Sequence, residues 1–273
     1  MKEPNLIRDD DLVMLLNDIA ELYGYDFTEY SKASLKRRIN RLCIIDRHAS
    51  FAELRYQIKS EPDYIHRFIE EITVNVTEMF RDPPFYKSLR EKVLPQLGTY
   101  PFIRIWMAGC STGEEVYSIA ILLKEANLYQ KSLLYATDIN PNVLEKARSG
   151  IFSLSQMKQY SENYIAAGGK QDFSSYYSAN YDKALFNNDL KAKMIFANHN
   201  LVSDRSFNEF QLIVCRNVLI YFDRELQRKV FNLFDDSLEA LGFLGLGSKE
   251  SIQFSNLAQN YKQLGVEKIW RKQ

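Results

Sequence analysis

The chain has 273 residues and a mass of 31.9 kDa, enough for one large and one small domain, and 46% of its residues are hydrophobic, as in globular proteins. No apolar run approaches the ~20 residues that span a bilayer, and the amino end lacks a secretory signal. Zero net charge with a pI of 6.8 argues against a nucleic-acid-binding protein. The sequence therefore predicts a cytoplasmic protein without membrane insertion. Its three dispersed cysteines indicate reduced thiols and no metal site.

Residues 9–94 have a helical pattern throughout. Asp9–Asp11 are candidate caps of the first helix, and Ser50–Glu53 reads as a capping box that opens a third. Pro83–Pro84 are expected to begin a connecting helix that ends near Pro95. The apolar stripes at helical spacing are Leu12, Leu15, Leu16, Ile19 and Leu22; Leu35, Ile39 and Leu42; and Tyr64, Phe68, Ile69, Ile72 and Val76.

Beyond residue 100, strand and helix patterns alternate. Strands are expected at 103–107, 133–137, 194–197, 211–215 and 243–246, and helices near 114–126, 141–148 and 223–241. Asp223 is expected to cap the last helix and Gly242 to stop it. The terminal run Val266–Trp270 is expected to add an edge strand.

The alternation predicts an α/β fold with a mostly parallel sheet and helices on both faces. The expected organisation is an all-helical N-terminal domain over 1–82, a connecting helix over 83–100 and a Rossmann-like domain over 101–273. Residues 150–192 are too long for one loop. They are expected to form a small subdomain inserted between the second and third strands.

Charge is distributed unevenly near the amino end. Residues 1–30 carry two bases against eight acids, whereas residues 31–59 carry eight bases against two acids. In the helix around 35–42, Arg37 and Arg41 lie roughly opposite the apolar stripe. This asymmetry indicates a face for an anionic partner. The alternative is a solvated helix face that the preceding acids partly neutralise.

Residues 103–115, I-R-I-W-M-A-G-C-S-T-G-E-E, combine a strand, a glycine turn and the start of a helix. This order is typical of the adenosine-binding edge of a doubly wound fold, because glycines let the backbone approach a ligand and the helix offers free N–H groups. The same turn also links strands to helices without binding anything. Carboxylates at Glu114 and Glu115 would repel a pyrophosphate. A cationic adenosine ligand, S-adenosylmethionine, fits better.

Polar residues follow three further strands. Asp138 ends the second strand, 25 positions after Gly113, where an acid is expected to bind ribose hydroxyls; its alternative role is to cap the helix at Asn140-Pro141. Asn200 follows the third strand with an amide that can donate to and accept from adenine. Arg216 and Asn217 follow the fourth, at the edge where open α/β sheets bind ligands.

These segments resemble motifs of the CheR chemotaxis receptor methyltransferase family, in the same order and over nearly the whole chain. Residues 75–81 read N-V-T-E-M-F-R, like the family's N-x-T-x-F-F-R, and residues 108–118 resemble its A-x-S-T-G-E-E-P-Y-S. Residues 136–139 match its second-strand tip, residues 145–152 its E-K-A-R-x-G-x-Y, and residues 215–222 its C-R-N-V-x-I-Y-F. Met79, Cys110 and Val116 are conservative departures.

The resemblance implies an S-adenosylmethionine pocket. Its lining would be Asn75, Thr77, Arg81, Glu115, Asp138, Asn200, Leu201, Asn217 and Val218. Glu115 would pair with the methionine ammonium, Asp138 would bind the ribose, and Asn200 and Leu201 would hold and flank adenine. The implied reaction methylates glutamate side chains of a methyl-accepting receptor, giving glutamyl methyl esters and S-adenosylhomocysteine, with no metal.

Arg81 and Tyr221 are the candidate catalytic residues, expected to steer the incoming carboxylate. Arg81 suits this role because guanidinium binds carboxylate in a planar fork, although a salt bridge to Asp82 or Glu78 is its alternative role. The basic helix with Arg37, Arg38 and Arg41 resembles the family's receptor-docking helix. The implied partner is therefore the cytoplasmic helical coiled-coil region of a receptor, bound by a monomeric enzyme.

Two other functions remain open from the sequence alone. One is a nucleic-acid methyltransferase that holds phosphates with residues 31–59, although the chain has no D/N-P-P-Y/F motif after its fourth strand. The other is a non-catalytic sensor or scaffold that binds S-adenosylmethionine without turnover.

Overall fold

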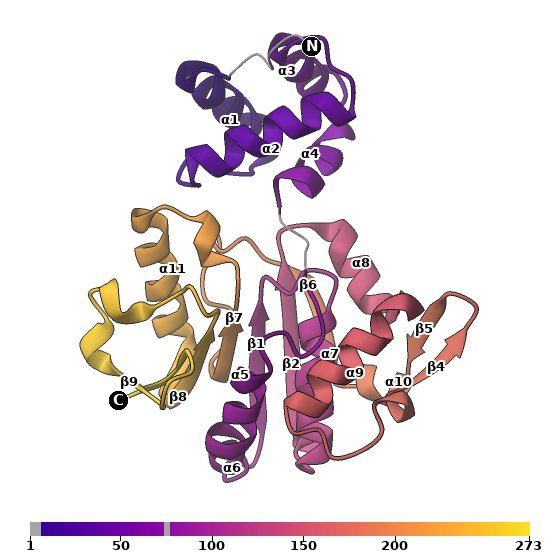
Figure 1. The fold of residues 1–273 in the computed structure, drawn as a ribbon. Coiled ribbons are helices and arrows are strands. Elements are labelled where there is room, and N and C mark those ends of the chain that lie inside the picture. Colours follow the sequence, from indigo (N-terminus) through magenta and orange to yellow (C-terminus); the bar gives the residue numbers. More distant parts are fainter. Residues whose placement is uncertain (1–6, 74–76) are drawn as a thin grey trace. The chain divides into compact units, whose positions relative to one another are not determined.

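The computed structural model describes residues 7–73 and 77–273 of the chain (Figure 1). These residues form two compact units. The helical unit consists of residues 7–73 together with Ile220–Lys229, and the sheet unit consists of 77–219 and 230–273. None of the described helices is both long and apolar enough to cross a membrane.

The helical unit contains four helices packed around an apolar core. They are α1 (Asp9–Tyr23), α2 (Lys32–Ile45), α3 (Phe51–Ser60) and α4 (Tyr64–Ile72). The predicted stripes are buried except at Tyr64, which is half-buried, and at Leu22, which is 54% exposed. Val76 lies outside the described residues. The Ser50 hydroxyl accepts the Glu53 N–H, which confirms the cap of α3. The N-cap residue of α1 is Arg8, which makes no side-chain capping bond, and Asp9–Asp11 lie inside the first turn instead.

Residues 220–229 join the helical unit although they lie far along the chain. Tyr30 forms an isolated antiparallel bridge with Phe222, and their rings pack edge to face, 4.8 Å apart. The Ser31 N–H donates to the Tyr221 carbonyl at 2.9 Å. Lys229 forms an ion pair with Glu29 at 2.6 Å. A strand-like segment and an ion pair therefore hold Tyr221 beside the start of α2.

The sheet unit is built on seven strands. They are β1 (Ile103–Ala108), β2 (Ser132–Asp138), β6 (Met194–Asn198), β7 (Phe210–Cys215), β8 (Leu238–Leu246), β9 (Tyr261–Gln263) and β10 (Ile269–Lys272). Their order is β6-β2-β1-β7-β8-β10-β9. The first five strands are parallel to one another, and β10 pairs antiparallel with both β8 and β9. Helices α7 (Glu114–Glu125) and α8 (Pro141–Ser149) pack against β2. This arrangement confirms the predicted α/β class.

Two predictions near the carboxyl end were wrong. The helix expected over 223–241 is α11 (Arg224–Ser237), which Asp223 caps by accepting the Leu226 N–H, and Gly242 does not end it. Residues 238–241 begin β8 instead, because Leu238 pairs with Phe210 of β7, and the strand expected over 243–246 is the second part of β8. Periodicity alone does not separate such a strand from a helix. The carboxyl-terminal strand, β10, pairs with both β8 and β9, so β9 is the edge.

An inserted subdomain lies between β2 and β6 in the chain, as predicted. It contains β3 (Ile151–Ser153), α9 (Met157–Ala166), β4 (Tyr177–Asn180), β5 (Lys183–Phe186) and α10 (Asn188–Lys191). Its strands form a separate antiparallel sheet in the order β3-β5-β4. The buried carboxylate of Glu125 in α7 contacts it by accepting the Lys170 N–H at 2.9 Å and the Tyr176 hydroxyl at 3.1 Å. The same carboxylate forms an ion pair with Arg90 at 2.5 Å.

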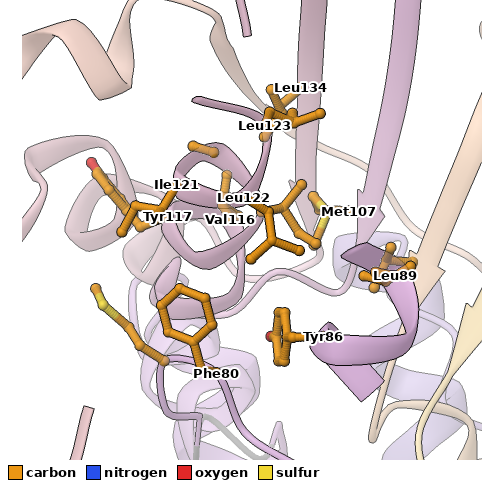
Figure 2. Packing of buried hydrophobic residues seen from close by; sticks show 14 of the residues in the cluster. Phe80, Tyr86, Leu89, Met107, Val116, Tyr117, Ile121, Leu122, Leu123 and Leu134 are labelled. Carbon is orange, nitrogen blue, oxygen red and sulfur yellow. The ribbon is translucent and has the colours of Figure 1, made fainter. Parts of the chain in front are cut away.

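The predicted connecting helix is interrupted. It consists of α5 (Pro83–Ser88), a π-helical turn over Leu89–Val93, and α6 (Leu94–Leu97). Its apolar face joins the main core of the sheet unit, where Figure 2 shows Tyr86 and Leu89 near the buried side chains of α7. The helix therefore fixes the segment before it, residues 77–82, to the core.

Candidate functional site

The five parallel strands all end at one edge of the sheet. The strand order reverses at β1: the chain adds β2 and β6 on one side of β1, and then β7 and β8 on the other side. Open α/β sheets bind ligands outside the carboxyl ends of their strands at such a switch point. The segments that follow these strands there are 109–115, 138–140, 199–201, 216–219 and 247–250.

The glycine turn after β1 is tightly packed by the protein itself. Gly109 and Gly113 have φ values of +73° and +96°, which favour glycine. A Cβ on Gly109 would lie 2.5 Å from Cγ2 of Val218, and one on Gly113 would lie 2.8 Å from Cβ of Ala147. These glycines therefore let the turn approach β7 and α8. Their closest neighbours are protein atoms rather than an open ligand space.

Asp138 is a buried acceptor at the end of β2. Its carboxylate accepts the N–H groups of Ser111 at 2.9 Å and Asn140 at 3.0 Å. Burial raises the pKa of this carboxyl above its usual range, and the backbone N–H groups partly offset that rise. The alternative role of Asp138 as a cap of α8 falls to Asn140, whose side-chain oxygen accepts the Asn142 N–H.

Two polar groups beside Asp138 fit a hydroxyl-bearing ligand. Ser111 Oγ and Asn140 Nδ2 are buried and have no hydrogen-bond partner among the described residues. Each costs free energy until it acquires one. A ribose, which both donates and accepts hydrogen bonds, suits such a set of groups next to a carboxylate. The chemistry of this corner therefore fits an adenosine ligand.

Glu115, the predicted partner of an ammonium, already has a cation beside it. Arg216 Nη1 lies 2.5 Å from its Oε1, and the Tyr86 hydroxyl donates to the same oxygen at 3.0 Å. Both contacts use Oε1, and no contact to Oε2 is seen within the described part of the chain. The carboxylate is therefore held in one orientation with one oxygen left over.

Arg216 connects the strand ends to the segment before α5. Besides Glu115, its guanidinium binds the Asp82 carboxylate at 2.7 Å and donates to the Arg81 carbonyl at 3.0 Å. It also lies over the Phe85 ring, 4.2 Å from the centroid. Burial by itself would lower the pKa of Arg216, but the neighbouring carboxylates outweigh burial and raise it. In the sequence, Arg216 stands out as a polar residue after the fourth strand, but nothing there predicts that it pairs with Glu115 and Asp82.

The segment with Arg81 is locally strained and strongly anchored. Phe80 and Asp82 have φ values of +53° and +58°, which cost free energy in residues other than glycine. Phe80 is fully buried beside Tyr86, and its N–H donates to the Ser118 hydroxyl at 3.0 Å (Figure 2). Anchors on both sides therefore fix the backbone of Arg81, whose side chain is half-buried.

The remaining predicted cofactor residues of the sheet unit lie close to the same edge. Asn200 is buried, and its side-chain oxygen accepts the Val202 N–H at 3.0 Å. That oxygen therefore already accepts one hydrogen bond from its own turn. Leu201, Asn217 and Val218 are half-buried at the strand ends, and Thr77 is half-buried in the segment before α5. Asn75 lies outside the described residues.

The predicted docking arginines and Tyr221 belong to the helical unit. Arg37 and Arg41 are exposed on α2, and Arg41 forms an ion pair with Glu71 at 3.2 Å. Arg38 differs, because its half-buried guanidinium donates to the Glu71 carbonyl and lies 5.6 Å from the centre of the Tyr221 ring. The structure thus separates Arg38, whose guanidinium is half-buried, from the exposed Arg37 and Arg41.

Part of the charge asymmetry is neutralised within the helical unit. Lys36 forms an ion pair with Asp9 at 2.6 Å, and Arg55 and Lys59 both pair with Asp18 at 2.5 and 2.8 Å. These contacts account for three of the eight bases over 31–59. The proposed anionic-partner face is therefore narrower than the sequence alone indicated.

Family comparisons cover both units of the chain. Residues 75–269 match the family described as the CheR methyltransferase, SAM binding domain. Residues 10–73 match the CheR methyltransferase, all-alpha domain. The chain belongs to the CheR methyltransferase family. It is therefore an S-adenosylmethionine-dependent methyltransferase with an all-helical amino-terminal domain.

Full-length relatives agree with this assignment. A Pseudomonas putida protein, provisionally named methyltransferase Cher3, is 44% identical over 97% of this chain and 97% of its own length. A chemotaxis protein methyltransferase of Listeria innocua is 32% identical over 84% of this chain and 85% of its own. One from Salmonella typhimurium is 34% identical over 72% of this chain and 67% of its own. This CheR-family enzyme thus matches its relatives along both units.

Proposed function

We propose that this CheR-family enzyme methylates glutamate side chains in the cytoplasmic coiled-coil region of a chemotaxis receptor, acting as a cytoplasmic monomer. Its family membership carries the proposal. S-adenosylmethionine, when bound, supplies the methyl group from its sulfonium. A receptor glutamate is already ionised at neutral pH, so the chain needs no general base. What the chain must supply is orientation of the two reactants, which can lower a barrier by several kcal/mol, up to ~7–11.

In this proposal, different residues bind the ribose and the methionine ammonium of S-adenosylmethionine. Asp138 would bind the ribose hydroxyls, with Ser111 and Asn140 as further polar groups beside it. Glu115 would bind the methionine ammonium through the oxygen that Arg216 and Tyr86 leave over. The other cofactor residues in this proposal are Asn75, Thr77, Arg81, Asn200, Leu201, Asn217 and Val218. The fixed backbone at Arg81 supports its further role in steering the incoming carboxylate, together with Tyr221.

The identity of the product tests the proposed reaction. The enzyme is incubated with methyl-labelled S-adenosylmethionine and receptor-containing membranes, and the labelled receptor is then treated with mild alkali. We expect label to leave as volatile methanol, because a carboxylate methyl ester is hydrolysed by base. A parallel incubation with Asp138→Ala should give much less label, since that variant lacks the proposed ribose acceptor. Label that stays on protein after alkali would identify an N- or S-methyltransferase and contradict the proposal.

A second experiment separates receptor docking from cofactor binding. Arg37→Ala combined with Arg41→Ala should raise the receptor KM about 5- to 10-fold at low salt and flatten its salt dependence, because exposed charges steer association through a screened field. Affinity for S-adenosylmethionine should stay unchanged. Arg38 is left intact because it contacts Tyr221.

Arg228→Ala is the matched control for the docking experiment. It removes another exposed arginine of the helical unit, from α11, and should leave the receptor KM close to the wild-type value. Equal increases in KM for the control and the double variant would mean that net charge, rather than the face of α2, governs receptor binding.

A further inference from the structure

The turn after β7 has a backbone conformation that needs support. Asn217 has a φ of +62°, a left-handed conformation that asparagine adopts more readily than most residues but still at some cost. The N–H groups of Asn217 and Val218 face into the protein, where each needs an acceptor. Something outside the turn must therefore define its shape.

Glu250, from the segment after β8, provides the acceptors. Its Oε2 accepts the N–H groups of Gly247 at 2.6 Å and Asn217 at 3.0 Å, and its Oε1 accepts the Val218 N–H at 2.9 Å. The residue is only 4% exposed. A carboxylate among converging N–H groups forms charge-assisted hydrogen bonds, which are about twice as strong as neutral ones. Both of its oxygens are thus used in holding backbone.

The neighbouring strand end is shaped to admit this carboxylate. β7 and β8 are parallel neighbours, with Cys215 opposite Leu246, so their following segments emerge side by side. A Cβ on Gly247 would lie 2.6 Å from Glu250 Oε2 and 2.8 Å from the Asn217 nitrogen. Only glycine allows that approach.

We propose that Glu250 is a positioning residue for the cofactor site: it fixes Asn217 and Val218 in the conformation that meets S-adenosylmethionine without touching the ligand. The inference rests on the proposed cofactor role of these two residues. Glu250 holds the segments after β7 and β8 together, so that the turn at Asn217 and Val218 is already ordered before the ligand binds.

Glu250→Gln tests the proposal with almost no change in volume. The new side chain keeps one acceptor oxygen but directs an NH2 donor at backbone N–H donors, so the turn would lose one of its two acceptor oxygens and the negative charge. We expect the Kd for S-adenosylmethionine, measured by calorimetry on folded protein, to rise about 10- to 30-fold, as for other residues that position ligand-binding groups. At saturating S-adenosylmethionine, kcat should fall less than about threefold, because the reacting groups are unchanged. Glu250→Asp, which keeps the charge but shortens the reach, should lose less affinity than Glu250→Gln.

Glu125→Gln is the matched control, because Glu125 is also a buried carboxylate that accepts a backbone N–H but lies at the other end of α7 from the strand tips. It should lower the unfolding temperature and leave the Kd within about twofold of wild type. Unchanged affinity in folded Glu250→Gln, or an equal loss of affinity in the control, would overturn the role of Glu250. If Glu250→Gln does not fold, the same criterion applies to Glu250→Asp. Failure of the wild-type chain to form alkali-labile methyl esters would instead contradict the proposed function.

Discussion

Arg216→Met is expected to lower the free energy of unfolding of the sheet unit by about 3–5 kcal/mol, the usual cost of removing one partner from a buried ion pair. The Arg216 side chain is 2% exposed, and that of Glu115 is 15% exposed, so the carboxylate would stay in a poorly solvated site without its cation. Asp82 contributes less, because its side chain is 43% exposed. Urea unfolding followed by circular dichroism measures the change.

The same experiment shows whether charge is the cause. Arg216→Met combined with Glu115→Gln should recover part of the loss, because the stranded carboxylate is gone. Arg271→Met is the matched control: it removes a guanidinium that lies over the Phe243 ring, with only a backbone carbonyl as hydrogen-bond partner in the described structure, and should cost less than about 1 kcal/mol. Equal losses in both single variants would show that ring packing, not the ion pair, carries the stability.

Glu114→Gln is expected to stabilise the protein at neutral and higher pH. Glu114 is 5% exposed, and burial raises its pKa from 4.5 to about 7, although a hydrogen bond from the Thr112 hydroxyl opposes that rise. The folded chain therefore holds this proton more tightly than the unfolded chain. The contribution of this proton to the free energy of unfolding is fully present below pH 4.5 and is lost as the pH rises through about 7. A shift of this size corresponds to about 3 kcal/mol, and glutamine would avoid that loss.

The free energy of unfolding of both proteins is measured from pH 4 to pH 8. The difference between Glu114→Gln and wild type should grow with pH and level off above about 7. Burial also raises the pKa values of Asp138 and Glu250, but both carboxyls are present in each protein and largely cancel in the difference. Parallel curves across the whole range would mean that Glu114 titrates alike in the folded and unfolded chains.

Local signals in the sequence predicted most of the fold. Strands β1, β2, β6 and β7 appear within one or two residues of their expected bounds, because each is a short apolar run with turn residues beside it. The cap of α3 at Ser50 and that of α11 at Asp223 were also local. The prediction failed at 238–241, where a helix was expected and pairing with a neighbouring strand decides for β8; the strand expected at 243–246 is the second part of β8.

The polar residues at the strand ends were found for the same reason. Asp138 and Asn217 stand out because each directly follows a buried run. Their hydrogen-bond partners could not be found in this way. Glu250 lies 33 positions after Asn217, and Arg216 lies 101 positions after Glu115, so no spacing rule connects them.

The sequence by itself determined most element types, the edge of the sheet proposed to bind the cofactor, and the family, because these depend on local composition and on motif order. Only the tertiary structure decided how charge is distributed at that edge. It paired Glu115 with Arg216 and placed Glu250 beside the backbone of the turn after β7. The physical reason is that a buried charge or N–H group must find a partner in space, and the order of strands across the sheet determines which partners are within reach.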